Sequence, residues 1–145
     1  MTKCPWIGLA MLLGLCACVE VDGGAVEAGW DLRFPDGRRT DDNGDSIDCT
    51  KAGLGRMALE LSALEGEGDP CAAQETCRFP CSSQGVGTTD FFIPPGEYAI
   101  SLQVLDPAGK ALGAADGIVA PGPVVRRVDN GQITSLSVNL IIVDR

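Results

Sequence analysis

The sequence predicts an all-β fold, an antiparallel β-sandwich of about seven short strands that follows an N-terminal signal-peptide helix. Apolar and polar residues alternate along several short segments, which is typical of strands with one buried face. Turn-forming residues separate these segments, and the 145 residues include 19 Gly and 9 Pro. The chain that follows the leader is long enough for one domain with a modest core.

The first predicted strand covers residues 26–34. Its inward face consists of Val26, Ala28, Trp30, Leu32 and Phe34. We expect Trp30 to anchor the core, because it is the largest apolar side chain on this face. A polar segment rich in turn residues follows at 35–48, and it predicts an exposed loop.

The second predicted strand covers residues 56–64, where Met57, Leu59 and Leu61 alternate with polar residues. Ala, Leu, Met and Glu also favour a helix here. We favour a strand, because the segment is short and Gly-rich residues flank it.

The middle of the chain gives shorter and weaker signals. We predict a polar loop at 65–74, a short strand at 76–81 that Pro80 interrupts, a turn at 82–87 and a short strand at 88–93.

The clearest strand signal lies at 98–105, and a tight turn follows at 106–110. The inward face of this strand consists of Tyr98, Ile100, Leu102 and Val104. We then predict a partner strand at 110–119, a short strand at 124–128 and a closing strand at 132–143. The candidate inward residues of the closing strand are Ile133, Leu136, Val138, Leu140 and Ile142.

Residues 93–110 read IPPGEYAISLQVLDPAGK. This segment resembles the Pro-Gly-x-Tyr entry, alternating strand and Asp-x-x-Gly-Lys turn of prealbumin-like and carboxypeptidase-regulatory-like sandwiches. The resemblance implies a prealbumin-like or, more broadly, immunoglobulin-like β-sandwich. Those domains are mostly accessory modules, so the resemblance assigns no catalytic residue. The long loop at 35–48 and the four Cys of the domain depart from that pattern and leave the sheet order open.

The N-terminus has the composition of a secretory signal peptide. Lys3 gives it a positive start, and an apolar run covers residues 7–15. That run is too short to cross a bilayer as a helix, which needs roughly 20 residues. The leader ends in Leu15-Cys16-Ala17-Cys18.

This Leu-x-Ala-Cys ending resembles the lipobox of bacterial lipoproteins, in which the Cys is lipidated and becomes the mature N-terminus. The match implies lipidation of Cys18, because the small Ala17 precedes it, whereas Leu15 precedes the competing Cys16. A plain secretory signal with an incidental Cys, or a buried N-terminal helix, are the alternatives.

The predicted organisation is a signal peptide at 1–17, a tether at 18–25 and a β-sandwich domain at 26–145. Two or three acyl chains on Cys18 would make membrane attachment effectively permanent. Val19 follows Cys18, where an Asp often retains Gram-negative lipoproteins at the inner membrane. The resemblance therefore implies an exported protein at the outer membrane.

Four Cys remain in the predicted domain, and an even number in an exported domain predicts two disulfides with three possible pairings. We favour Cys49–Cys81 as a long-range link and Cys71–Cys77 as a local clamp. The chain-entropy model gives them about 3.5 and about 2.5 kcal/mol. Zinc binding by Cys77 and Cys81 is the alternative, but the chain has no His and export favours oxidation.

Charge and composition narrow the function classes. The net charge is −9, which argues against nucleic acid as a partner, since that needs clustered Lys and Arg. The absence of His and of a G-x-S-x-G motif removes the commonest catalytic machinery. We therefore expect a non-enzymatic structural or binding module that meets the membrane through Cys18 and an envelope protein or glycan that the sequence does not identify.

The loop at 35–48 offers the one site-like motif. Asp41, Asn43, Asp45 and Asp48 place oxygen ligands at spacings that calcium loops use. The EF-hand pattern then needs Gly at its sixth position and Glu at its twelfth, and this loop fails at both. A non-EF calcium loop is the alternative function, and an acidic surface turn without a cofactor is the competing interpretation.

Overall fold

The computed structural model describes residues 21–145, so the predicted signal peptide, Cys18 and the first part of the tether lie outside the described residues. The described part is all-β, with two single-turn 3₁₀ helices, η1 (Glu75–Cys77) and η2 (Ala114–Asp116). The strands are β1 (Ala25–Arg33), β2 (Arg56–Ala63), β3 (Arg78–Pro80), β4 (Gln84–Thr88), β5 (Gly96–Leu105), β6 (Ala111–Leu112), β7 (Ile118–Val119), β8 (Val124–Val128) and β9 (Ile133–Val143). Their number exceeds the predicted seven or so, in part because the single strand predicted at 110–119 is replaced by two strands of two residues each, β6 and β7.

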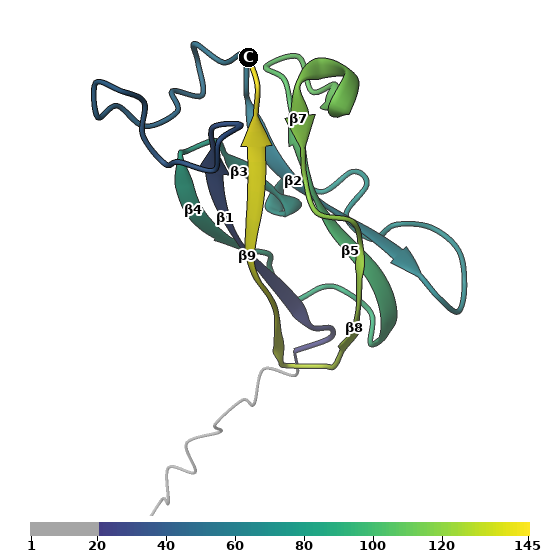
Figure 1. Cartoon of the computed structure of the whole chain (residues 1–145). Helices are drawn as coiled ribbons and strands as arrows, with labels where there is room; N and C mark the ends of the chain where they lie inside the picture. Colours follow the sequence, from purple (N-terminus) through teal and green to yellow (C-terminus); the bar gives the residue numbers. More distant parts are fainter. Residues whose placement is uncertain (1–20) are drawn as a thin grey trace, which may run out of the picture.

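The strands form two sheets that enclose a shared core (Figure 1). One sheet has the order β4-β1-β9-β7, and the other has the order β3-β2-β5-β6, with β8 also paired to β5. The prediction of an antiparallel sandwich is wrong for one pair, because β1 and β9 run parallel. A parallel pair needs a long crossover connection, and here the rest of the domain provides it.

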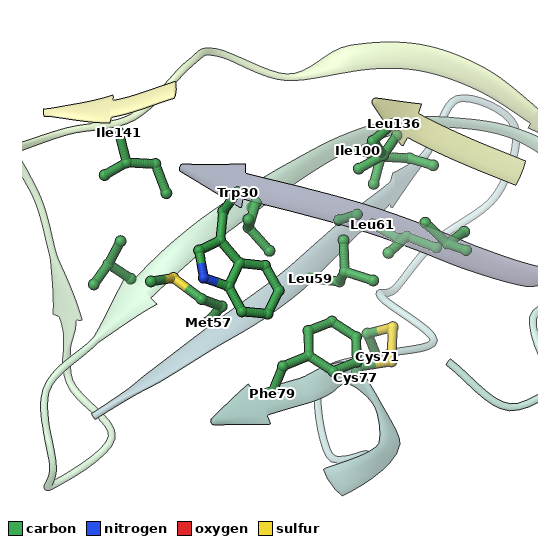
Figure 2. Close-up of a cluster of buried hydrophobic side chains, with 14 of the residues drawn as sticks. Trp30, Met57, Leu59, Leu61, Cys71, Cys77, Phe79, Ile100, Leu136 and Ile141 are labelled. Carbon is green, nitrogen blue, oxygen red and sulfur yellow. A yellow bond between two sulfur atoms is a disulfide. The ribbon is translucent and has the colours of Figure 1, made fainter. Parts of the chain in front are cut away.

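The core confirms three predicted strand faces. In β1 the inward side chains from Val26 to Leu32 are buried, and Trp30 is only 3% exposed. In β2 the predicted inward residues Met57, Leu59 and Leu61 are buried, and the segment is a strand, as favoured over a helix. In β5 the four predicted inward residues are buried, as Tyr98 and Ile100 illustrate. Figure 2 shows Trp30, Met57, Leu59 and Leu61 within this cluster.

The predicted turn at 82–87 and strand at 88–93 are wrong. The structure places strand β4 at Gln84–Thr88, and the segment after it is irregular, with one isolated bridge from Ile93 to Gly24. Gly85 and Gly87 suggested a turn, but both face the interior of the sandwich. A Cβ at Gly85 would overlap the indole of Trp30, and one at Gly87 would overlap the ring of Phe79. These glycines therefore make room for aromatic side chains.

The predicted partner strand at 110–119 is also broken. Strand β6 pairs with β5, whereas β7 pairs with β9 in the opposite sheet. Between them η2 carries the chain from one sheet to the other. Gly117 closes η2 in the left-handed region at φ 78°, and a Cβ there would overlap the carbonyl oxygen of Asp144. The segment predicted as one strand therefore contains the connection at which the chain passes from one sheet to the other.

The predicted inward face of the closing strand is correct only for Leu136. The core side chains beyond it are Ile141 and Val143, whereas Val138 and Leu140 are 62% and 53% exposed. Ile133 is also exposed, and Ile142 is half-buried. The cause is a β-bulge: Ser137 has φ 62°, and the pairing with β1 shifts register at this level. The extra residue reverses the alternation of every side chain that follows.

The structure contains the two disulfides that the sequence analysis favoured, Cys49–Cys81 and Cys71–Cys77. The zinc alternative is therefore wrong for this structure, since Cys77 and Cys81 are bonded to different partners. The first disulfide ties the loop after β1 to the end of β3. The second is buried in the core, with Cys71 3% and Cys77 0% exposed (Figure 2).

Candidate functional site

The loop between β1 and β2 surrounds a surface cavity of about 200 Å³. Its lining combines apolar and charged side chains, among them Phe34, Ile47, Val143, Asp41, Asp45, Asp48, Lys51 and Arg145. Three of the four predicted calcium ligands thus lie around one cavity, and Asn43 is not in its lining. Two cationic side chains share the same walls, so the cavity is not purely acidic.

The carboxylate of Asp41 is engaged by its own loop. Its Oδ1 accepts the backbone N–H groups of Asn43 at 2.8 Å and Asp45 at 3.0 Å. These bonds, with that of Asp45 first and that of Asn43 second, lower the pKa of Asp41. An Asp that accepts backbone N–H groups in this way stabilises a turn. The carboxylate of Asp41 therefore stabilises the turn at residues 41–45.

Asp48 has an equivalent local role in the next turn. Its Oδ1 accepts the backbone N–H of Lys51 at 3.0 Å, and its carbonyl oxygen accepts the backbone N–H of Ala52 at 2.9 Å. Within residues 21–145, no three His, Cys, Asp or Glu side chains converge as a metal site requires. The four predicted ligands share one loop without forming a ligand shell.

We expect calcium to leave the stability of the protein unchanged. The carboxylates of Asp41 and Asp48 are already engaged by backbone N–H groups, and Lys51 opposes a cation in the cavity. Thermal unfolding with 5 mM calcium (on the order of weak extracellular sites) should match unfolding with magnesium. A rise in Tm with calcium alone, lost in Asp45→Asn, would contradict this expectation.

A second polar cluster, which was not predicted from the sequence, is centred on Asp31 of β1. Asp31 is 2% exposed, although it lies on the outer face of its sheet. Its Oδ2 accepts hydrogen bonds from Arg33 at 2.6 and 2.8 Å and from Arg39 Nε at 3.1 Å. Its Oδ1 accepts a hydrogen bond from the Gln84 amide at 3.3 Å. The cluster joins β1, β4 and the loop after β1.

Opposing effects act on the pKa of Asp31. Burial raises the pKa of Asp31. The hydrogen bonds from Arg33 and Gln84 and the charges of Arg33 and Arg39 lower this pKa by a larger amount, so the net shift is downward. Asp31 is therefore ionised and fully paired at neutral pH. Two guanidinium groups and an amide around one carboxylate form a structural lock that holds the loop against the sheet.

We expect Asp31→Asn to destabilise the domain by about 2 kcal/mol at pH 7, because charge-assisted hydrogen bonds to two arginines are lost. The pKa of Asp31 is lower in the folded state. Its contribution is thus complete above the unfolded pKa, near 4, and is lost as the pH falls through the folded pKa. Urea unfolding of the wild type and of Asp31→Asn from pH 7 to pH 2 measures this contribution to the free energy of unfolding.

The matched control is Asp36→Asn, since Asp36 is exposed and pairs with Arg38 in the same loop. An exposed ion pair contributes roughly 0–1 kcal/mol. The gap between the wild type and Asp31→Asn should narrow with acid. A gap that stays constant to pH 2, or an equal effect of the control, would contradict the lock.

No helix within residues 21–145 has the length and apolar character needed to cross a membrane. Cys18, the predicted lipidation site, lies outside the described residues. No family model matches the chain, and neither the curated proteins nor the solved structures contain a match.

Proposed function

We propose that this protein is a lipid-anchored lipoprotein of the bacterial cell envelope, with a non-enzymatic sandwich domain that acts as a structural or binding module. The observation that carries the proposal is the position of Cys18, at the end of a signal-like leader and directly before the domain. The pairing of all four Cys in residues 21–145 is compatible with an oxidising compartment.

The short connection between anchor and domain supports a role at the membrane surface. Residues 19–23 separate Cys18 from Gly24, the first described residue that forms a β-bridge. Five residues span at most about 18 Å when extended. On this proposal the domain stays next to the outer membrane, where it meets an envelope protein or a glycan.

We also propose that the sandwich belongs to the prealbumin-like or immunoglobulin-like class. The Tyr98 hydroxyl donates a hydrogen bond of 2.7 Å to the carbonyl oxygen of Pro94 at the entry to β5. A tyrosine that bonds back to the backbone a few residues upstream is a feature of such sandwiches. The calcium alternative is less favoured, because Asp41 and Asp48 accept backbone N–H groups of their own loop and Lys51 and Arg145 share the cavity.

Lipidation is tested by comparing Cys18→Ser with the matched control Cys16→Ser in cells fed labelled palmitate. We expect Cys18→Ser to lose the label and to leave the detergent phase, because the thiol that carries the lipid is gone. Cys16→Ser should keep both properties. Label that persists in Cys18→Ser, or that disappears only in the control, would overturn the proposal.

A further inference from the structure

The outer face of the β4-β1-β9-β7 sheet is unusually apolar. Half of the large hydrophobic side chains that are exposed in residues 21–145 lie on it, namely Val86, Val119, Ile133, Val138 and Leu140. Each is more than half exposed. The bulge at Ser137 is one cause, because it turns Val138 and Leu140 away from the core.

Three of these side chains are close neighbours, and Ile133 and Val119 extend the apolar face toward its two ends. Val86 of β4 and Val138 of β9 both pair with Gly29 of β1, so they flank a position that has no side chain. Leu140 lies one step further along β9, beside Asp31. The exposed fractions of the five side chains correspond to roughly 400 Å² of apolar surface, which is the size of the largest apolar patch on a typical monomer, and such patches are often functional.

The charges at the two ends of this face are opposite. Glu27 lies at one end of β1 and has no ion-pair partner among the described residues. Arg33 and Arg39 lie at the other end, around Asp31. The face therefore carries two acidic and two basic groups, whereas the chain as a whole carries −9. Two copies of the chain repel each other through the rest of their acidic surface, but the formal charges on this face sum to zero.

We propose that this outer face binds a second copy of the same chain around a two-fold axis that runs across the strands. Such an axis brings the Glu27 end of one copy over the Arg39 end of the other, twice per dimer. It also places Val138 against Leu140 of the second copy. A self-complementary patch of this kind is what a two-fold interface requires.

The size of the patch sets the strength of the interaction. A stable interface buries about 800 Å² on each partner, so the apolar centre of roughly 400 Å² supplies about half of that area and the polar residues around it supply the rest. The inference goes beyond the proposed function and does not depend on the lipid anchor. It predicts a reversible dimer whose population rises with protein concentration.

Sedimentation equilibrium of the full chain, in a detergent matched to the solvent density, tests the proposal. We expect a monomer–dimer equilibrium that Val138→Lys weakens by at least about 100-fold, because it places an unpaired charge in the interface. The matched control is Val125→Lys, which alters a 52% exposed valine of β8 in the other sheet. The control should keep the wild-type dissociation constant.

Glu27→Lys tests the orientation separately. It should weaken the dimer by about 10-fold, since a cation then faces Arg39 of the second copy. A chain that stays monomeric at millimolar concentration would overturn the proposal, as would a dimer that neither Val138→Lys nor Glu27→Lys affects. Binding of the unlipidated Cys18→Ser chain, as a monomer, to neutral phosphatidylcholine vesicles would also overturn the proposal and assign the face to lipid if Val138→Lys alone abolishes it.

Discussion

Gly87→Ala is expected to destabilise the domain by about 3 kcal/mol or more, the upper range for overpacking a core. The new methyl group would overlap the Cγ and both Cδ atoms of Phe79, which lie at the root of the ring and cannot swing away. Phe79 is 8% exposed and stacks on Trp30, with ring centroids 6.1 Å apart. The two sheets must separate, or the aromatic pair must break.

The matched control for this substitution is Gly122→Ala, because a Cβ at Gly122 meets nothing within 4 Å. Urea unfolding monitored by Trp fluorescence gives both free energies of unfolding. The penalty for Gly87→Ala should shrink in a Phe79→Ala background, which removes the overlapping atoms. A Gly87→Ala protein as stable as the control would contradict the packing of β4 against β3.

The double substitution of Cys71 and Cys77 by Ala is expected to cost about 4 kcal/mol, at least as much as the loss of Cys49–Cys81. Chain entropy alone ranks the longer loop first, at 32 residues of separation against 6. Burial changes this ranking, because Cys71 and Cys77 lie in the core and their sulfur atoms leave a void. Cys49 and Cys81 are only half-buried.

Urea unfolding of the two double variants under the same oxidising conditions makes the comparison. Each variant keeps the other disulfide and introduces no free thiol, so it is the control for its counterpart. A Cys71/Cys77 variant that loses clearly less stability than the Cys49/Cys81 variant would contradict the buried position of the local clamp.

The sequence predicted those parts of the fold whose local pattern agrees with their tertiary setting. β1, β2 and β5 alternate over at least eight residues, so their inward faces follow directly. The faces of β9 were not predictable beyond Leu136, because one residue in the left-handed region reverses the alternation. β4 was mistaken for a turn because it contains Gly85 and Gly87. These glycines leave room for the aromatic rings of Trp30 and Phe79, which come from other strands.

The same reasoning explains the candidate sites. The favoured cysteine pairing, a long-range link and a local clamp, agrees with the structure. The spacing of Asp41 and Asp45 suggested a metal, but the same spacing caps a turn. The lock around Asp31 requires Gln84, which pairs with it across the sheet. Only the charged residues Asp31, Arg33 and Arg39 were visible as a local signal.

Mass spectrometry of the N-terminal peptide, from protein isolated out of a bacterial envelope, tests the account most directly. We predict a mature chain that begins at Cys18 and carries a diacylglyceryl thioether on its sulfur. The same sample should contain the Cys49–Cys81 and Cys71–Cys77 disulfides intact. A chain that begins at Met1 with unmodified Cys18 and free thiols would contradict it.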